Sequence, residues 1–194
     1  MAEAELARFI DRFTMEYVRT YPHPIERVWR AIIEPEEFGA WFIKGRLDPR
    51  VGGRYWFGDD GFQGVVEAIE PPRRLRLVDD KAGQVFQYDL AKVTGGTRMR
   101  FTYRFGPDHG YVEVPDPATD DGAPITFHRG GDLPGGADTP WRPGFLAGWH
   151  AMFDSLADVL GGVEKRPRRW PELIGRYREH IKATIPPARE GQDA

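Results

Sequence analysis

The chain has 194 residues, a formal net charge of −3 and no cysteine. This length favours one domain with additions. The lack of cysteine excludes disulfides, thiol catalysis and thiolate metal sites, and the charge gives no reason to expect nucleic acid or an anionic membrane as a partner. The opening stretch, "MAEAELARFIDRF", is acidic and contains no uninterrupted apolar run. We therefore expect a cytoplasmic protein without a signal peptide or membrane span.

The first two elements are predicted from their apolar spacing. Residues 3–13 have helical periodicity, so we treat 1–13 as an N-terminal amphipathic helix. Residues 14–21 alternate in the manner of a strand, which Pro22 and Pro24 end. Pro24 suits the first turn of a helix that carries the apolar stripe of 25–33. A second short helical turn ends in Trp41 and Phe42.

A series of strands follows. In the last of them Met99, Phe101 and Tyr103 alternate with Arg98 and Arg100, which predicts one buried and one wet face and an antiparallel sheet. Glycine accepts positive φ without penalty, so the Gly-Gly pair between the first two strands predicts a tight turn. The predicted strands are 46–50, 53–58, 62–69, 74–79, 84–93 and 97–105.

The last third of the chain is less regular. Residues 106–143 are dense in Gly, Pro and Asp and are interpreted as a loop insertion. A long helix over 145–160 follows, ended by a glycine pair at 161–162. Beyond it, 163–194 is a basic linker with a short final helix at 171–181. A sheet with one apolar face needs cover, and the long helix is the partner of adequate length.

Seven motifs in chain order carry a family resemblance. They are "PIERVW" at 24–29, Trp41, "DPRVGG" at 48–53, G-x-V at 64–66, "EPPRRL" at 70–75, "GGT" at 95–97 and "GW" at 148–149. The chain resembles the family of activator of heat-shock-protein-90 ATPase homologue-like proteins, in the START-like (SRPBCC) superfamily. The resemblance implies an α+β helix-grip fold over 14–162: a curled seven-stranded antiparallel sheet around the long C-terminal helix, with a cavity between them. It also implies that "DPRVGG" is a structural turn.

The superfamily includes lipid carriers, hormone and antibiotic binders, polyketide cyclases and chaperone-linked modules, so fold does not fix function. We expect a non-catalytic module that binds or sequesters a hydrophobic or aromatic small molecule in the cavity, with the 106–143 insertion across its entrance. No metal site and no cofactor are expected. The proposed lining residues are Tyr55, Phe57, Tyr88, Phe101, Tyr103, Trp141, Trp149, His150 and Phe153.

Two other functions stay open. A cyclase- or hydrolase-like enzyme acting on a polyketide-like substrate would use His150, or His109 or His128 of the insertion, as acid–base. A protein-interaction or chaperone-linked module would dock a partner, or a second copy as a homodimer, on its terminal helices. Arg19 shares a strand face with apolar residues. It is expected to extend out at the sheet edge, the alternatives being a carboxylate partner such as Glu16 or Asp89, or an acidic group on a ligand.

Overall fold

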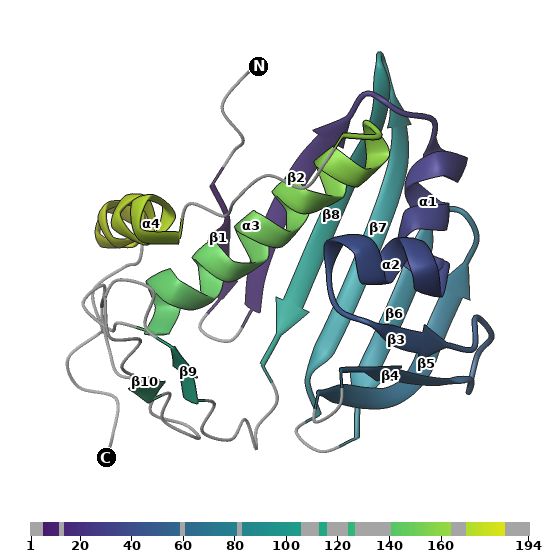
Figure 1. Ribbon diagram of the computed structural model, residues 1–194, viewed down its shortest axis with the longest axis horizontal. Helices are drawn as coiled ribbons and strands as arrows, with labels where there is room; N and C mark the ends of the chain where they lie inside the picture. Colours follow the sequence, from purple (N-terminus) through teal and green to yellow (C-terminus); the bar gives the residue numbers. More distant parts are fainter. Residues whose placement is uncertain are drawn as a thin grey trace.

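An eight-stranded antiparallel sheet with helices on one face forms the frame of the protein (Figure 1). The computed structural model describes residues 6–11, 14–58, 61–80, 83–105, 113–115, 124–126, 141–163 and 170–184. The strands of the sheet, in spatial order, are β1 (Arg8–Asp11), β2 (Thr14–Tyr21), β8 (Gly96–Arg104), β7 (Val85–Val93), β6 (Arg74–Asp79), β5 (Phe62–Glu70), β4 (Arg54–Phe57) and β3 (Gly45–Leu47).

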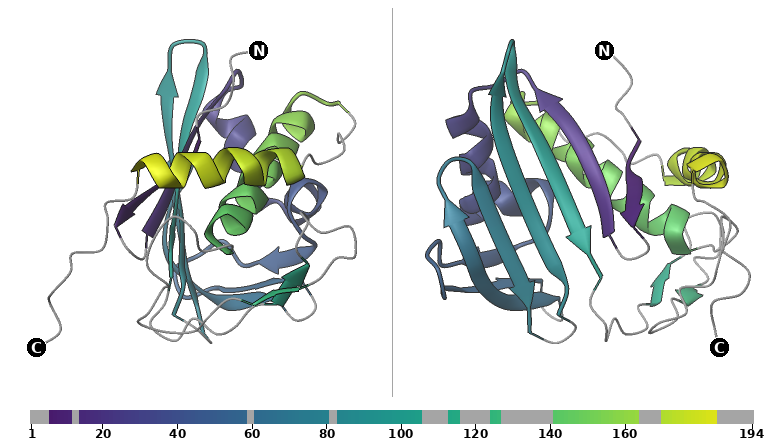
Figure 2. Two further views of the ribbon diagram at one scale, coloured as in Figure 1. Left: turned by 90° about the vertical axis from the view of Figure 1, so that its left-hand side faces the viewer. Right: turned by 180° about the vertical axis from the view of Figure 1, so that it is seen from behind.

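The helices cover the concave face of this sheet. α3 (Trp141–Leu160) crosses it diagonally, α1 (Ile25–Ile33) and α2 (Pro35–Trp41) lie beside it, and α4 (Trp170–Thr184) packs against α3 near the β1 edge (Figure 1). In the view from behind in Figure 2, α1, α2 and α3 lie on the side of the sheet that faces away from the viewer. Within the insertion, the short strands β9 (Glu113–Pro115) and β10 (Pro124–Thr126) pair with each other. This arrangement confirms the helix-grip fold, with one strand more than the seven expected.

The additional strand lies where the sequence predicts a helix. Residues 8–11 form β1, which pairs with β2 through Arg8–Glu16 and Phe9–Met15, so the helical prediction is wrong there. Phe9 stacks on Phe105 with 6.5 Å between ring centroids. The open edge of β2 offers hydrogen bonds and an apolar neighbour that a short isolated helix lacks, and tertiary context overrides the local periodicity. Residues 1–5 and 12–13 lie outside the described residues.

The register predicted for β8 is confirmed. Met99, Phe101 and Tyr103 are fully buried on the concave face, whereas Arg98 and Arg100 are exposed on the other. The three apolar side chains therefore belong to the core and the two arginines do not, as the period of two requires. The six strands predicted from 46 to 105 all exist, with ends displaced by three residues at most.

The glycine pair after β3 serves two separate purposes. Gly52 has a φ of +76°, and a Cβ added there would contact nothing within 4 Å. Gly53 is needed for space, because its Cβ would lie 2.2 Å from the carbonyl oxygen of Asp48. The turn is tied to β5 by hydrogen bonds from Gly52 N to Val66 O and from Val66 N to Gly53 O, both 2.8 Å. Positive φ therefore explains the need for glycine at position 52 only, and lack of space explains it at position 53.

α3 begins at Trp141, four residues before the predicted start. Pro143 does not prevent this, because it falls within the first turn, where a missing N–H is tolerated. The helix ends as predicted at Leu160, before the glycine pair, and Gly162 has a φ of +66°. The N–H groups of Gly161 and Val163 bond to the carbonyls of Ala157 and Asp158. This is the usual way in which a left-handed glycine satisfies the last carbonyls of a helix.

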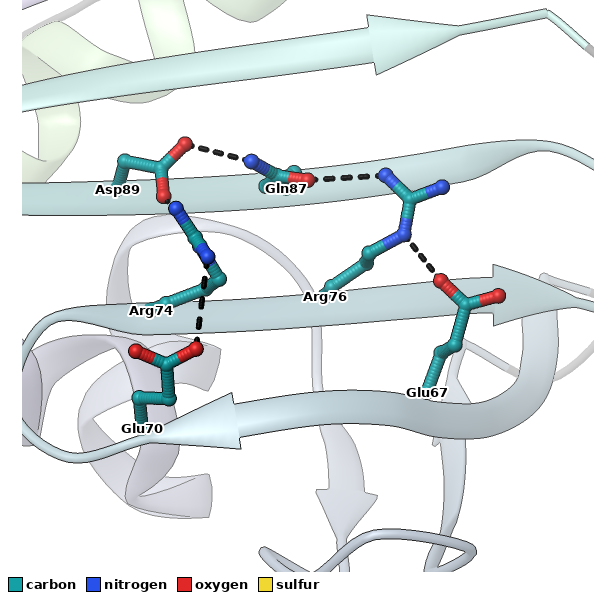
Figure 3. A network of polar contacts seen from close by, with 6 residues as sticks. All are labelled: Glu67, Glu70, Arg74, Arg76, Gln87 and Asp89. Carbon is teal, nitrogen blue, oxygen red and sulfur yellow. Dashed lines mark hydrogen bonds and ion pairs between the residues drawn. The ribbon is translucent and has the colours of Figure 1, made fainter.

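Charged and polar side chains on the outer face of the sheet form ion pairs and hydrogen bonds with one another (Figure 3). Arg74 of β6 contacts Asp89 at 2.8 Å and Glu70 at 3.4 Å, and Arg76 bonds to Glu67 and to Gln87. These pairs are exposed to solvent in large part, so each contributes little to stability. The network belongs to the wet side and does not reach the interior between sheet and helix.

Candidate functional site

The interior between α3 and the sheet is built almost entirely from aromatic rings. Trp149 of α3 lies at its centre, with centroid distances of 4.5 Å to Phe101 and 5.8 Å to Phe153. Of the predicted lining residues, the structure brings seven to this interior as buried side chains: Tyr55, Phe57, Tyr88, Phe101, Tyr103, Trp149 and Phe153. Trp141 begins α3, and its side chain lies outside the described residues.

Phe42 covers the central tryptophan from the side. It follows α2, is only half-buried, and stacks on Trp149 with 5.1 Å between centroids and an interplanar angle of 17°. The neighbouring Ile43 is exposed at 40%. Phe42 is therefore a half-buried ring in direct contact with Trp149. Sequence reasoning placed Phe42 after a helical turn but did not assign it to the site.

At the β4 end of the interior, two polar side chains lie in one row across three strands, with a glycine between them. Tyr55 of β4 faces Gly64 of β5, and Gly64 faces Asp79 of β6. A Cβ added at Gly64 would lie 2.9 Å from Cε1 of Tyr55 and 1.9 Å from the Val78 carbonyl oxygen. The glycine of the G-x-V motif thus leaves room for the tyrosine ring.

Within the described part of the chain, the hydroxyl of Tyr55 has no hydrogen-bond partner, although the residue is only 1% exposed. Its neighbours are better satisfied: Asp79 Oδ2 accepts from the backbone N–H of Gln63 at 3.2 Å, and Tyr103 donates to the side-chain oxygen of Gln84. A buried polar atom without a partner is rare and calls for an explanation. Asp79 and Gln84, both buried, were not predicted as site residues.

Burial keeps the interior phenols protonated. It raises the pKa of Tyr55 well above its ordinary value, and the Asp79 and Asp80 carboxylates raise it further. Burial likewise raises the pKa values of Tyr88 and Tyr103. These groups act as neutral hydrogen-bonding side chains at any physiological pH.

His150 faces the other side of α3, away from this interior. Its Nδ1 lies 2.8 Å from the hydroxyl of Tyr177 on α4, which also accepts the backbone N–H of Ala7 at 3.1 Å. The other ring nitrogen, Nε2, lies 3.6 Å from Oδ2 of Asp154. Burial lowers the pKa of His150 to about 3, with Arg19 and Arg176 acting in the same direction. The Nδ1 nitrogen is thus engaged by Tyr177, and Nε2 faces Asp154.

Arg19 does not extend out at the sheet edge, so that expectation is wrong. The residue is buried, its NH1 donates to the Val18 carbonyl at 3.0 Å, and its guanidinium lies 5.9 Å from the ring centroid of Tyr17. Its charge acts on Tyr177 of α4, so the side chain lies toward α4 and not out in solvent. Glu16 pairs instead with Arg8, and Asp89 pairs with an arginine of β6.

Two shallow hollows lie away from the aromatic interior, at the start of α1. Their volumes are about 370 and 380 Å³, and both are lined by Ile25, Glu26 and Lys92. Glu26 and Lys92 form an exposed ion pair at 3.1 Å between them. Neither hollow contains a predicted lining residue, so a cavity under α3 stays a prediction.

Other site types find no support in the described residues. No group of three His, Asp or Glu side chains within them could hold a metal ion. None of the helices in the described ranges has the length and apolar character needed to cross a membrane. His109 and His128, the alternative acid–base candidates, lie outside the described residues.

Comparison with known proteins agrees with this architecture. The family model described as "Activator of Hsp90 ATPase homolog 1-like protein" matches residues 22–161. The crystal structure of CalU16 from Micromonospora echinospora is similar at 18% identity and a TM-score of 0.57, over 93% of this chain and 96% of that one. The protein EF2215 of unknown function from Enterococcus faecalis has 15% identity and a TM-score of 0.64, over 93% of this chain and 92% of its own.

The AHSA1-like protein from Aeromonas hydrophila has 22% identity and a TM-score of 0.52, over 79% of this chain and 97% of its own. At identities this low, the structural similarity shows a shared fold and nothing more. No curated protein matches the chain.

Proposed function

Because the chain belongs to the family of activator of Hsp90 ATPase homolog 1-like proteins, we propose that it is a non-catalytic module that binds a hydrophobic or aromatic small molecule between α3 and the sheet. One observation carries the proposal: the hydroxyl of Tyr55 is buried inside an aromatic interior and finds no partner among the residues that the structure describes. Ligand sites combine mostly apolar walls with a few polar groups that fix orientation. Tyr55 is such a polar group.

The energetics favour a ligand as the missing partner. Leaving a buried hydroxyl unpaired costs roughly 1–3 kcal/mol relative to a satisfied one. A protein gains nothing from this cost unless another molecule completes the hydrogen bond. The surrounding rings, among them Phe57 at 4.9 Å from the Tyr55 centroid, supply the apolar contacts for the body of that molecule.

Entry requires one ring to move. Trp149 is packed against its neighbours in this closed form, and Phe42 is the half-buried ring that covers it. Rotation of Phe42 about its side-chain bonds would expose the indole face without disturbing a strand. We therefore place the ligand on Trp149, with Phe42 displaced and the polar end directed at Tyr55.

The geometry favours binding over the two other functions. An acid–base role for His150 needs a free ring nitrogen facing a substrate, whereas both nitrogens face Tyr177 and Asp154. A docking role for α4 needs an unused apolar face, whereas Leu173, Ile174 and Tyr177 are buried in this fold.

The test uses the neutral fluorescent probe 1-anilinonaphthalene, whose N–H can bond to the Tyr55 oxygen. The folded protein should bind it, and Tyr55→Phe should weaken binding about fivefold, the loss of one hydrogen bond. Tyr55→Phe should not lower the free energy of unfolding, since it removes an unsatisfied group. Phe42→Ala should speed association.

Trp149→Phe should weaken binding, and Trp56→Phe should not, because Trp56 points to the opposite face of β4. If the folded protein does not bind the probe, or if Tyr55→Phe is destabilised with unchanged binding, the proposal is wrong.

A further inference from the structure

A second candidate site lies at the start of α1, outside the aromatic interior. The more enclosed of the two hollows there has a volume of about 380 Å³, within the range of small-molecule sites. Three segments line it: the first turn of α1, the turn between β5 and β6, and the end of β7. We call it the α1 hollow. Its apolar lining residues are Ile25, Pro72, Leu90 and Ala91.

The walls of the α1 hollow are ordered by the fold itself. Ile25 and Leu90 are only 2% and 5% exposed, and both belong to the hydrophobic core. The turn between β5 and β6 is tied to β7 by a hydrogen bond of 2.7 Å from Leu90 N to Arg73 O. A site whose walls are already in place loses little conformational entropy when a ligand binds.

Two cations and one anion complete the lining. Lys92 and Glu26 form an ion pair of 3.1 Å. The side chain of Arg73 makes no hydrogen bond or ion pair within the described part of the chain. Glu70, three residues earlier, contacts Arg74 on the outer face instead (Figure 3). The lining of the α1 hollow therefore has one positive charge in excess.

We propose that the α1 hollow binds aliphatic monocarboxylates, with the carboxylate held by Arg73 and Lys92 and the alkyl chain on the apolar lining. A carboxylate can accept both bonds of a guanidinium fork, and its single charge balances the excess charge of the lining. An organic ammonium ion would meet two like charges, and a dianion would leave a negative charge beside Glu26. The proposal is independent of the one for the aromatic interior, so either can fail alone.

The test is an NMR titration of the ¹⁵N-labelled protein with hexanoate and with hexanamide, a neutral molecule of nearly the same shape. Hexanoate should shift the amide resonances of Arg73, Leu90 and Lys92, with a dissociation constant of about 1 mM because the ligand is small. Hexanamide should bind at least about fivefold more weakly. The indole N–H of Trp149 should not shift, because the interior is a separate site.

Variants then identify the groups that hold the carboxylate. Arg73→Gln should weaken hexanoate binding about fivefold, and Lys92→Gln should weaken it as well. Glu26→Gln should tighten it, since the change frees Lys92 and removes a like charge. Arg104→Gln is the matched control, because this exposed arginine lies at the other end of β8 and does not line the hollow. It should leave the affinity unchanged.

Equal affinities for hexanoate and hexanamide, or an unchanged affinity in Arg73→Gln, would overturn the proposal. Hexanoate that shifts the Trp149 indole and leaves the Arg73 amide in place would also overturn it, since the acid would then occupy the interior. If hexanoate does not bind at all, the α1 hollow is no such site, and the interior is judged separately by 1-anilinonaphthalene. Arg73 is exposed, so its variant should melt with the wild type. If it does not fold, the comparison of the two ligands in the wild type decides.

Discussion

The neutral imidazole of His150 should make the stability of the protein depend on pH in a way that one substitution can isolate. Folding lowers the pKa of this histidine from its ordinary value of 6.5 to about 3, chiefly by burial. Between these values the unfolded chain binds a proton that the folded chain does not. The free energy of unfolding therefore has its full value above pH 6.5 and falls as the pH falls toward 3.

The size of the effect follows from the two pKa values. Between pH 8 and pH 5, linkage predicts a loss of about 2 kcal/mol from this one group. Arg19 on β2 and Arg176 on α4 favour the neutral ring. Asp154 on α3 opposes them, but its carboxylate is 48% exposed and 3.6 Å away, so solvent screens most of its effect.

Urea unfolding at pH 8 and pH 5 measures the loss. His150→Gln does not titrate, and its side-chain amide can hydrogen-bond to the Tyr177 hydroxyl, so this variant should lose about 2 kcal/mol less than the wild type over the same interval. His23→Gln serves as the control, since His23 lies half-buried in the turn before α1. If the wild type and His150→Gln lose equal amounts, His150 is not held neutral and the account of its surroundings is wrong.

Two further predictions concern glycines. Gly52→Ala should lower the free energy of unfolding by about 1 kcal/mol through its positive φ alone. Gly53→Ala should lower the free energy of unfolding by more, about 2 kcal/mol or above. Its Cβ would clash with the Asp48 carbonyl, and the backbone shift needed to relieve the clash would weaken two turn hydrogen bonds. Equal costs in chemical denaturation would contradict this division. Gly175→Ala should raise stability by up to about 1 kcal/mol, since the residue is exposed in α4 and its Cβ contacts nothing. A lowered melting temperature would show that α4 does not have this form.

Most of the sheet could be predicted because its alternation is local. The period of two placed Met99, Phe101 and Tyr103 inward and the arginines of β8 outward, as the structure confirms. β1 could not be predicted in this way. Its apolar residues suit a helix equally well, and the open edge of β2 that decides between the two is a tertiary feature.

The candidate site was predictable in its apolar part only. The inward aromatic residues follow from strand alternation, and the same alternation in 74–79 places Asp79 with Leu75 and Leu77, a signal that sequence reasoning overlooked. Which phenol lacks a partner could not be predicted. Tyr17, for example, finds the Leu146 carbonyl at 2.7 Å, 129 residues away. The direction of His150 likewise depends on Tyr177, a residue of a separate helix.

Tyr177 also ties the two ends of the described chain to each other. Its hydroxyl holds the N–H of Ala7, 170 residues earlier, as well as the ring of His150. Under a mechanical load applied through the two ends, this contact lies in parallel with the chain between them, because it joins the segment at Ala7 directly to α4. Stretching is therefore expected to detach α4 in a small first event, before the load reaches the hydrogen-bond ladders of the eight-stranded sheet.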